Sequence, residues 1–111
     1  MDKRNIIIPI KLPETKLTLD TTPVNIFNYF RETYPDWYSS HKDKFNICNS
    51  IRLYAFSGDF GILIDGNDAA VDNAMIVAEG IHFIENVSID KVSLIGLASG
   101  TEVVVQIGLI G

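Results

Sequence analysis

The sequence predicts an all-β fold, an antiparallel β-sandwich or a jelly-roll-like arrangement, in a single domain over residues 1–111. Roughly seven or eight short segments alternate apolar and polar residues and recur about every ten residues, with turn-forming residues between them. No strand–helix–strand alternation of the kind that builds a parallel sheet is present. A chain of 111 residues, 47% of them hydrophobic, is long enough to bury a core without disulfides or a structural metal.

Two strands are predicted near the start of the sequence. Residues 4–12 alternate between two faces, and Pro9 within them indicates an edge strand or a bulge. Residues 16–20 form a second short strand, with Leu17 and Leu19 facing the core.

Residues 22–48 depart from the β pattern and are expected to be a helix and loop insertion. A short helix near 23–35 is predicted from a proline at its first position and an aromatic stripe at helical spacing, although a strand also fits. Residues 36–45 are expected to form an exposed loop. Trp37 and Tyr38 in this loop are candidates either to anchor a partner or to cover one end of the core.

From residue 49 onwards the pattern is that of β-strands. Turn clusters around glycines separate the apolar segments and supply the conformations that tight connections need. The strands predicted in this region cover residues 51–56, 60–64, 75–78, 81–85, 92–97 and 103–110.

The last two predicted strands, 92–97 and 103–110, are expected to form a β-hairpin around Gly100, which supplies a positive φ. The opposite face of the last strand carries Val104 and Ile110, where a solvated face would be mostly polar. That face therefore requires a cover, either from the same chain or from another subunit. The inner face of the last strand consists of Val103, Val105, Ile107 and Leu109.

The residue types that carry chemistry form no recognisable catalytic or metal site. Cys48 lies between apolar and amide neighbours and is predicted to be a small buried hydrophobe. His41 and His82 lack the spacing of a metal-ligand pair, and the acidic segment 65–72 fits a turn better than a calcium loop. Nucleophile-elbow and phosphate-loop motifs are absent. We therefore predict a protein that is not an enzyme and that binds no cofactor or metal.

The charge pattern argues against nucleic acid as a partner. The net charge is −5, and acidic residues are interspersed among the basic ones, so the sequence contains no basic stripe. Neither an apolar run of membrane-span length nor a secretory signal is visible, so we expect no membrane partner and synthesis in a reducing cytoplasm.

The order of strands and turns between residues 49 and 111 carries a family resemblance. The segments that carry it are 51–54, 58–62, 79–83, 87–94 and 98–105. In this order the chain resembles short β-sandwich proteins of tailed-bacteriophage virions, such as capsid decoration or head–tail components. The proline of that family's turn is absent, and Ala78 stands in its place.

The resemblance implies a virion structural protein that has no catalytic residues and is made in the host cytoplasm. Such a protein would act as a homo-oligomer or while bound to a lattice, through apolar β faces, with itself or with other virion structural proteins as partners. We expect Val104 and Ile110 to form the interface, with Trp37 and Tyr38 as secondary anchors. The alternative is a small non-catalytic binding module for carbohydrate or for a host protein.

Overall fold

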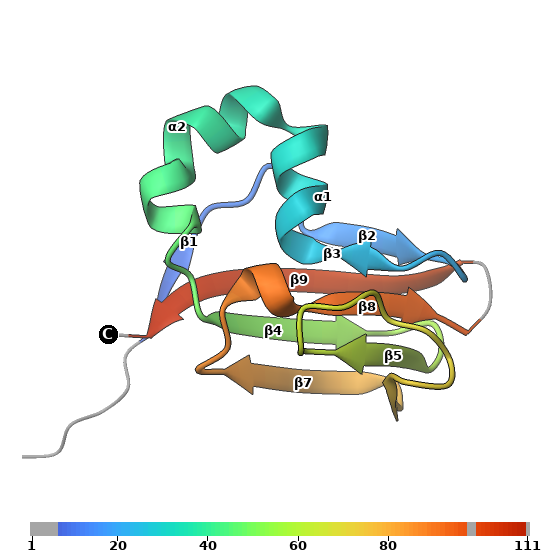
Figure 1. Ribbon diagram of the computed structural model, residues 1–111. Helices are drawn as coiled ribbons and strands as arrows, with labels where there is room; N and C mark the ends of the chain where they lie inside the picture. The colour runs from blue at the N-terminus through green and yellow to red at the C-terminus, as the bar shows by residue number, and fades with distance from the viewer. Residues whose placement is uncertain (1–6, 98–99, 111) are drawn as a thin grey trace, which may run out of the picture.

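The computed structural model describes residues 7–97 and 100–110 as two antiparallel sheets that face each other, with two helices at one end (Figure 1). This arrangement confirms the predicted all-β sandwich fold. The helices are α1 (Ile26–Thr33) and α2 (Pro35–Phe45), and a short 3-10 helix covers Ile89–Lys91. The strands are β1 (Ile7–Ile10), β2 (Lys16–Leu19), β3 (Val24–Asn25), β4 (Ser50–Ala55), β5 (Phe60–Leu63), β6 (Met75–Val77), β7 (Gly80–Glu85), β8 (Ser93–Gly96) and β9 (Thr101–Ile110).

The larger sheet is built around β9. Its five strands follow the order β1-β9-β4-β7, and β2 also pairs with β9, on the same edge as β1. Between β1 and β2, residues 11–15 bulge away from the sheet, and the Val105 N–H donates to the Thr15 carbonyl oxygen at 2.6 Å. Because side chains alternate along a strand, Val103, Val105 and Ile107 all face the core and are buried.

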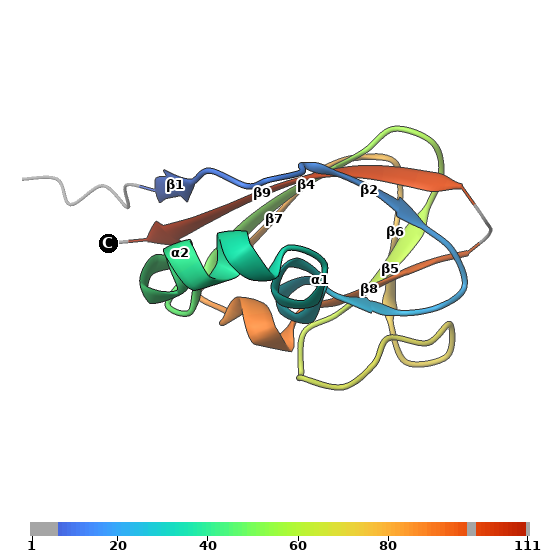
Figure 2. The same ribbon diagram turned by 90° about the horizontal axis from the view of Figure 1, so that it is seen from above.

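The hairpin predicted from segments 92–97 and 103–110 is wrong. β8 pairs with β3 and β5 in the smaller sheet, of order β3-β8-β5-β6, whereas β9 belongs to the larger sheet. The chain therefore crosses from one layer of the sandwich to the other between β8 and β9 (Figure 2). Gly100 lies beside this crossing with φ +91°, so the expected positive φ is present. Apolar alternation is the same for a hairpin as for a crossing between packed sheets, which explains the error.

The apolar second face of β8 is covered by the same chain. Ile95 is buried, and the segment that precedes and forms β6 lies close to it. A Cβ atom at Gly61 would approach both Ala74 Cβ and Ile95 Cγ2 to 2.9 Å, so only glycine permits this close packing. Ile95 is therefore covered by the same chain, whereas Leu97 directly after β8 is 40% exposed.

The predicted helix near 23–35 is present, but it begins later than expected. Val24 and Asn25 first pair with β8 as β3, and α1 starts at Ile26. The Asn25 side-chain oxygen accepts from the Asn28 N–H at 3.0 Å, which satisfies one of the free amides of the first turn. The cap at Asn25, rather than the proline at position 23, therefore sets the start of the helix.

The loop predicted for residues 36–45 is wrong, because this segment is helix α2. Pro35 occupies the first turn beside Asp36, and lysines lie in the last turn, an arrangement that suits the helix dipole. Trp37 and Phe45 turn inward, with ring centroids 5.1 Å apart. The apolar residues are few but recur at helical spacing, and tertiary packing stabilises the helix.

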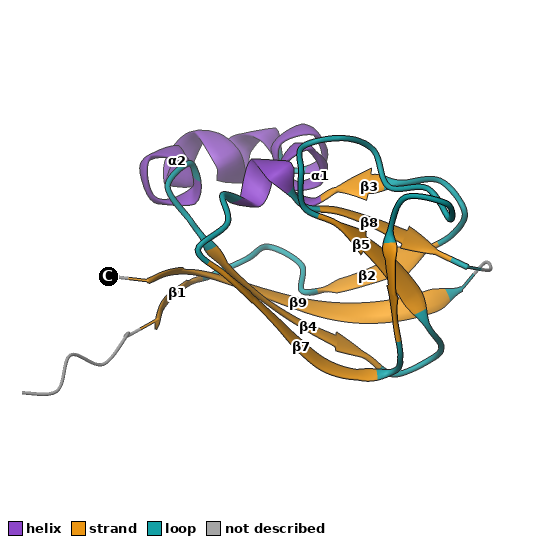
Figure 3. Ribbon diagram, turned by 60° about the horizontal axis from the view of Figure 1, so that its bottom comes forward, coloured by secondary structure: helices purple, strands orange, loops and turns teal. Residues whose placement is uncertain are grey.

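One buried cluster joins both sheets and both helices. The helices lie beside the smaller sheet, over the same face of the larger sheet (Figure 3). Phe30 and Phe45 are fully buried, and their rings meet edge-on with centroids 6.1 Å apart. This aromatic pair closes the end of the core that the smaller sheet leaves open.

We expect Phe45→Ala to lower the free energy of unfolding by about 3–5 kcal/mol, because it removes a fully buried aromatic side chain. Urea titration followed by circular dichroism measures this change. Val71→Ala is the control, since Val71 is 61% exposed and the change should stay within about 0.5 kcal/mol. Equal effects of the two substitutions would contradict the packing of α2 onto the core.

Candidate protein-binding face

The outer face of the larger sheet, which points away from the smaller sheet, collects large apolar side chains from three strands. Tyr54 of β4 pairs with Ile81 of β7 on one side and with Val104 of β9 on the other. Arg52 pairs with Phe83 in the neighbouring row. Directly paired residues share a face, so these side chains stand next to one another.

We name the exposed apolar part of this face the outer patch, formed by Tyr54, Phe56, Ile81, Phe83 and Val104. Ile81 and Phe83 are each 59% exposed, Tyr54 is 47% exposed and Phe56 is 42% exposed, while Val104 is half-buried among them. Four large side chains at about half exposure present on the order of 400 Å² of mostly apolar surface. The largest apolar patch on a single chain typically has this size and is often functional.

The outer patch is hollowed at its centre. A depression of about 200 Å³ lies between the side chains of the three strands. A protruding apolar side chain of a binding partner would fill such a depression, as anchor residues do at protein interfaces. Its lining comprises Arg52, Leu53, Tyr54, Ile81, Phe83, Val104 and Gln106.

The charges around the outer patch balance. The Arg52 guanidinium lies 5.3 Å from the Phe83 ring centroid, and the Lys16 ammonium lies 2.7 Å from a Glu102 carboxylate oxygen. We name Lys16, Arg52, Glu102 and Glu85, which lies on the same face, the rim; it has two basic and two acidic side chains. The rim is therefore neutral although the chain has a net charge of −5, and it provides no basic surface for nucleic acid.

The structure does not bring the four predicted interface residues together. Val104 lies within the outer patch, and Ile110 belongs to β9, but its side chain is outside the described part of the chain. Trp37 and Tyr38 lie on α2, at the other side of the larger sheet. The Trp37 Nε1–H donates to the Lys11 carbonyl oxygen at 3.1 Å, and the Tyr38 hydroxyl donates to Asn46 Oδ1 at 3.0 Å.

These contacts agree with the alternative in which Trp37 and Tyr38 cover one end of the core. Both side chains are half-buried, and their rings pack around Phe45. A role for them in an interface stays a prediction.

Four residues of the outer patch were not predicted from the sequence: Tyr54, Phe56, Ile81 and Phe83. The alternation in 51–56 already places Tyr54 and Phe56 opposite the core residues, and the alternation in 81–85 does the same for Ile81 and Phe83. The sequence does not show that these two segments pair side by side, because this depends on the register between strands that are far apart in the sequence.

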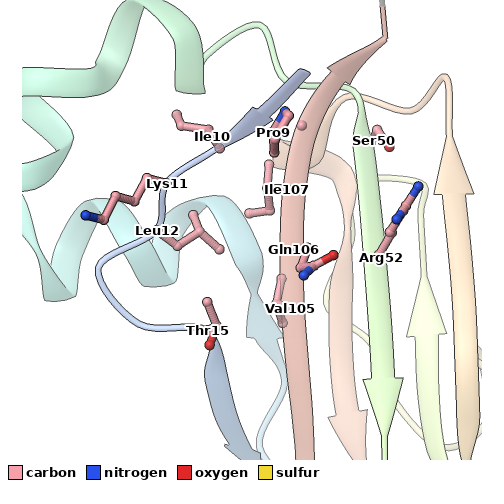
Figure 4. A pocket seen from close by; sticks show the side chains of 11 residues that line it. Pro9, Ile10, Lys11, Leu12, Thr15, Ser50, Arg52, Val105, Gln106 and Ile107 are labelled. Carbon is pink, nitrogen blue, oxygen red and sulfur yellow. The ribbon is translucent and has the colours of Figure 1, made fainter. Parts of the chain in front are cut away.

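A cavity of about 500 Å³ lies where residues 11–15 leave the sheet beside β9. Its walls include the apolar side chains of Ile10, Leu12 and Ile107 (Figure 4). The charged side chains of Lys11 and Arg52 extend from it in opposite directions, so they do not converge on a bound group. Neither histidine lines this cavity.

Both histidines form hydrogen bonds within their own segments. His41 Nδ1 donates to the Trp37 carbonyl oxygen at 2.8 Å, and His82 Nε2 donates to the Ala78 carbonyl oxygen at 2.7 Å. In the acidic segment, Asp65 accepts from the Asn67 N–H at 3.0 Å, which is the expected turn. Across residues 7–97 and 100–110, no group of three or more His, Cys, Asp or Glu side chains is arranged to hold a metal ion.

Neither of the two α-helices is long and apolar enough to cross a membrane, as judged from the residues that the structure describes. Comparison with protein-family models, with curated proteins and with solved structures finds no match for this chain. The resemblance of residues 49–111 to virion proteins therefore stays a prediction.

Cys48 is buried, as predicted, and its thiol donates to the Lys44 carbonyl oxygen at 3.1 Å. Burial raises the pKa of this thiol from its ordinary value of 9.0 to about 11, so the thiolate is scarce at neutral pH. Because folding raises this pKa, the protonated thiol stabilises the folded chain. This contribution to the free energy of unfolding is fully present below the unfolded pKa of 9.0 and is lost as the pH rises through about 11.

We expect an aromatic disulfide reagent to leave Cys48 of the folded chain unlabelled at pH 8 and to label it completely in urea. Absorbance of the released thiolate measures the reaction. Rapid labelling of the folded chain would contradict the burial of this thiol.

Proposed function

We propose that this chain is a non-catalytic structural protein that assembles with copies of itself through the outer patch. The observation that carries the proposal is the gathering of four large exposed side chains from β4, its continuation and β7 on one face. Isolated exposed apolar residues are ordinary, whereas a contiguous group on a twisted sheet is a hazard unless a partner covers it.

The energetics of burial support self-association. Covering on the order of 400 Å² on each copy, at about 25 cal/mol per Å², contributes about 10 kcal/mol per copy. Association costs about 4–15 kcal/mol in lost freedom and ordering, so two buried patches exceed this cost. A complete interface of about 800 Å² per partner would include the charged rim as well as the outer patch.

The composition of the rim favours a second copy of the chain as partner. Lys16 and Arg52 are balanced by Glu85 and Glu102, so two copies related by a two-fold axis can place unlike charges opposite each other. A strongly charged partner would gain little from a neutral rim.

A carbohydrate-binding role has less support from the side chains. Sugar recognition requires polar groups that point at hydroxyls beside a free aromatic face. The Trp37 ring instead stacks on His41 at a centroid distance of 5.0 Å, and its N–H is bonded within the chain. Assembly in a virion is the more specific role that the sequence resemblance implies, and it depends on that resemblance alone.

We expect Tyr54→Asp to weaken self-association at least tenfold, because it places a charge at the centre of the outer patch. Sedimentation equilibrium should show the wild-type mass rising with concentration above the 12.3 kDa of one chain, and the variant should need a higher concentration. Met75→Asp is the matched control, since Met75 is 63% exposed on β6 of the other sheet. Circular dichroism verifies that both variants fold.

A wild-type chain that keeps the mass of one copy at every concentration would overturn the proposal. So would equal weakening by Tyr54→Asp and Met75→Asp, because the effect would then not belong to the outer patch.

A further inference from the structure

β7 forms one edge of the larger sheet. It is the last strand in the order β1-β9-β4-β7, and among the described residues no strand pairs with its second side. Its six residues pair with β4 in one unbroken register from Gly80 to Glu85. Figure 3 shows it at the border of the sandwich.

The other sheet edges carry features that discourage pairing with a further strand. β3 has two residues and β6 has three, which is too short for a stable ladder. The edge made by β1 and β2 is interrupted by residues 11–15 and contains Pro9. β7 has no proline, lysine, arginine or bulge, and its one acidic side chain, Glu85, lies at its last position.

The hydrogen bonds of β4 reveal which backbone groups of β7 are free. The Phe56 N–H donates to the Glu102 carbonyl oxygen of β9, and successive residues of a strand direct their backbone groups to opposite sides. Leu53 lies three residues before Phe56, so its backbone groups point to the opposite side of β4. They bond towards β7, where the partner of Leu53 is His82. The residues of β7 whose backbone groups point to the open side are Ile81, Phe83 and Glu85.

We propose that β7 pairs antiparallel with β7 of a second copy, about a two-fold axis through Phe83. In this register Phe83 lies opposite itself, and Ile81 lies opposite Glu85 of the other copy in both directions. Each of these pairs exchanges two backbone hydrogen bonds. The outward-pointing backbone groups of all three residues thereby gain hydrogen-bond partners, and the pairing extends no further than β7 itself.

The charges on the strand favour this register over the neighbouring one whose axis lies at His82. Moving the two-fold axis to His82 would place Glu79 opposite Glu85, and like charges directly opposite are destabilising. With the axis at Phe83, no like charges are paired. The two Phe83 rings meet instead, each with an Arg52 guanidinium 5.3 Å from its centroid.

This pairing is separate from burial of the outer patch. It joins two five-stranded sheets into one continuous sheet and leaves both copies of the outer patch on the same face. Tyr54→Asp, which tests assembly through the outer patch, leaves the β7 backbone unchanged, so the two proposals can fail independently.

Disulfide trapping in the Tyr54→Asp background tests the pairing. Opposite residues in a hydrogen-bonded antiparallel pair have Cα atoms about 5.5 Å apart, which is within disulfide reach. The two Ile81 residues would be offset by four residues, about 13 Å along the strand.

We expect Phe83→Cys to form a disulfide-linked dimer on mild oxidation at least tenfold faster than Ile81→Cys, as measured by non-reducing electrophoresis. The Tyr54→Asp chain, with only the buried Cys48, should not link.

A second pair of variants isolates the backbone contribution. Glu85→Pro removes one outward N–H without touching the bonds to β4, and it should slow the linking of Phe83→Cys at least tenfold. Glu85→Ala keeps the N–H and should not slow it. Equal linking rates for Phe83→Cys and Ile81→Cys, or no effect of the proline, would overturn the strand pairing.

Discussion

The larger sheet depends on β9, because this one strand holds three others. β1 and β2 share one of its edges, and β4 takes the other. Its inner side chains, Val103, Val105 and Ile107, reach the centre of the core, while Val104 between them belongs to the outer patch. Core and outer patch are therefore fixed relative to each other by the alternation of a single strand. A one-residue slip in its register would turn the core residues outward and the outer-patch residue inward.

Most strands could be predicted from the sequence, because a half-buried strand leaves a period of two in its side chains. The pairing of the strands could not be predicted. Segments 92–97 and 103–110 show the pattern of a hairpin, yet β8 and β9 lie in opposite layers. Segment 36–45 is polar and for that reason suggests a loop, although Pro35 and Asp36 are ordinary signals for the start of a helix.

The sequence predicts an apolar outer face on the last strand, but not which residues of other strands extend it. Val104 indicated an apolar outer face, since a solvated strand would carry a polar residue there. The larger contributions come from Tyr54 and Phe56 near β4 and from Ile81 and Phe83 on β7, which the register of two non-adjacent segments brings together. Periodicity gives the face on which a side chain lies, and only the fold gives its neighbours across the sheet.

The dependence on β9 also has a consequence for how the chain folds during synthesis. β1 and β2 precede every other described element, yet their only strand partner in the described structure is β9. The larger sheet therefore cannot close until Thr101–Ile110 has left the ribosome, and Leu17 and Leu19 must wait without a cover until then. Pairings between such distant segments form slowly. The nascent chain thus has a long period in which chaperones can engage it and in which neighbouring nascent chains can associate with it.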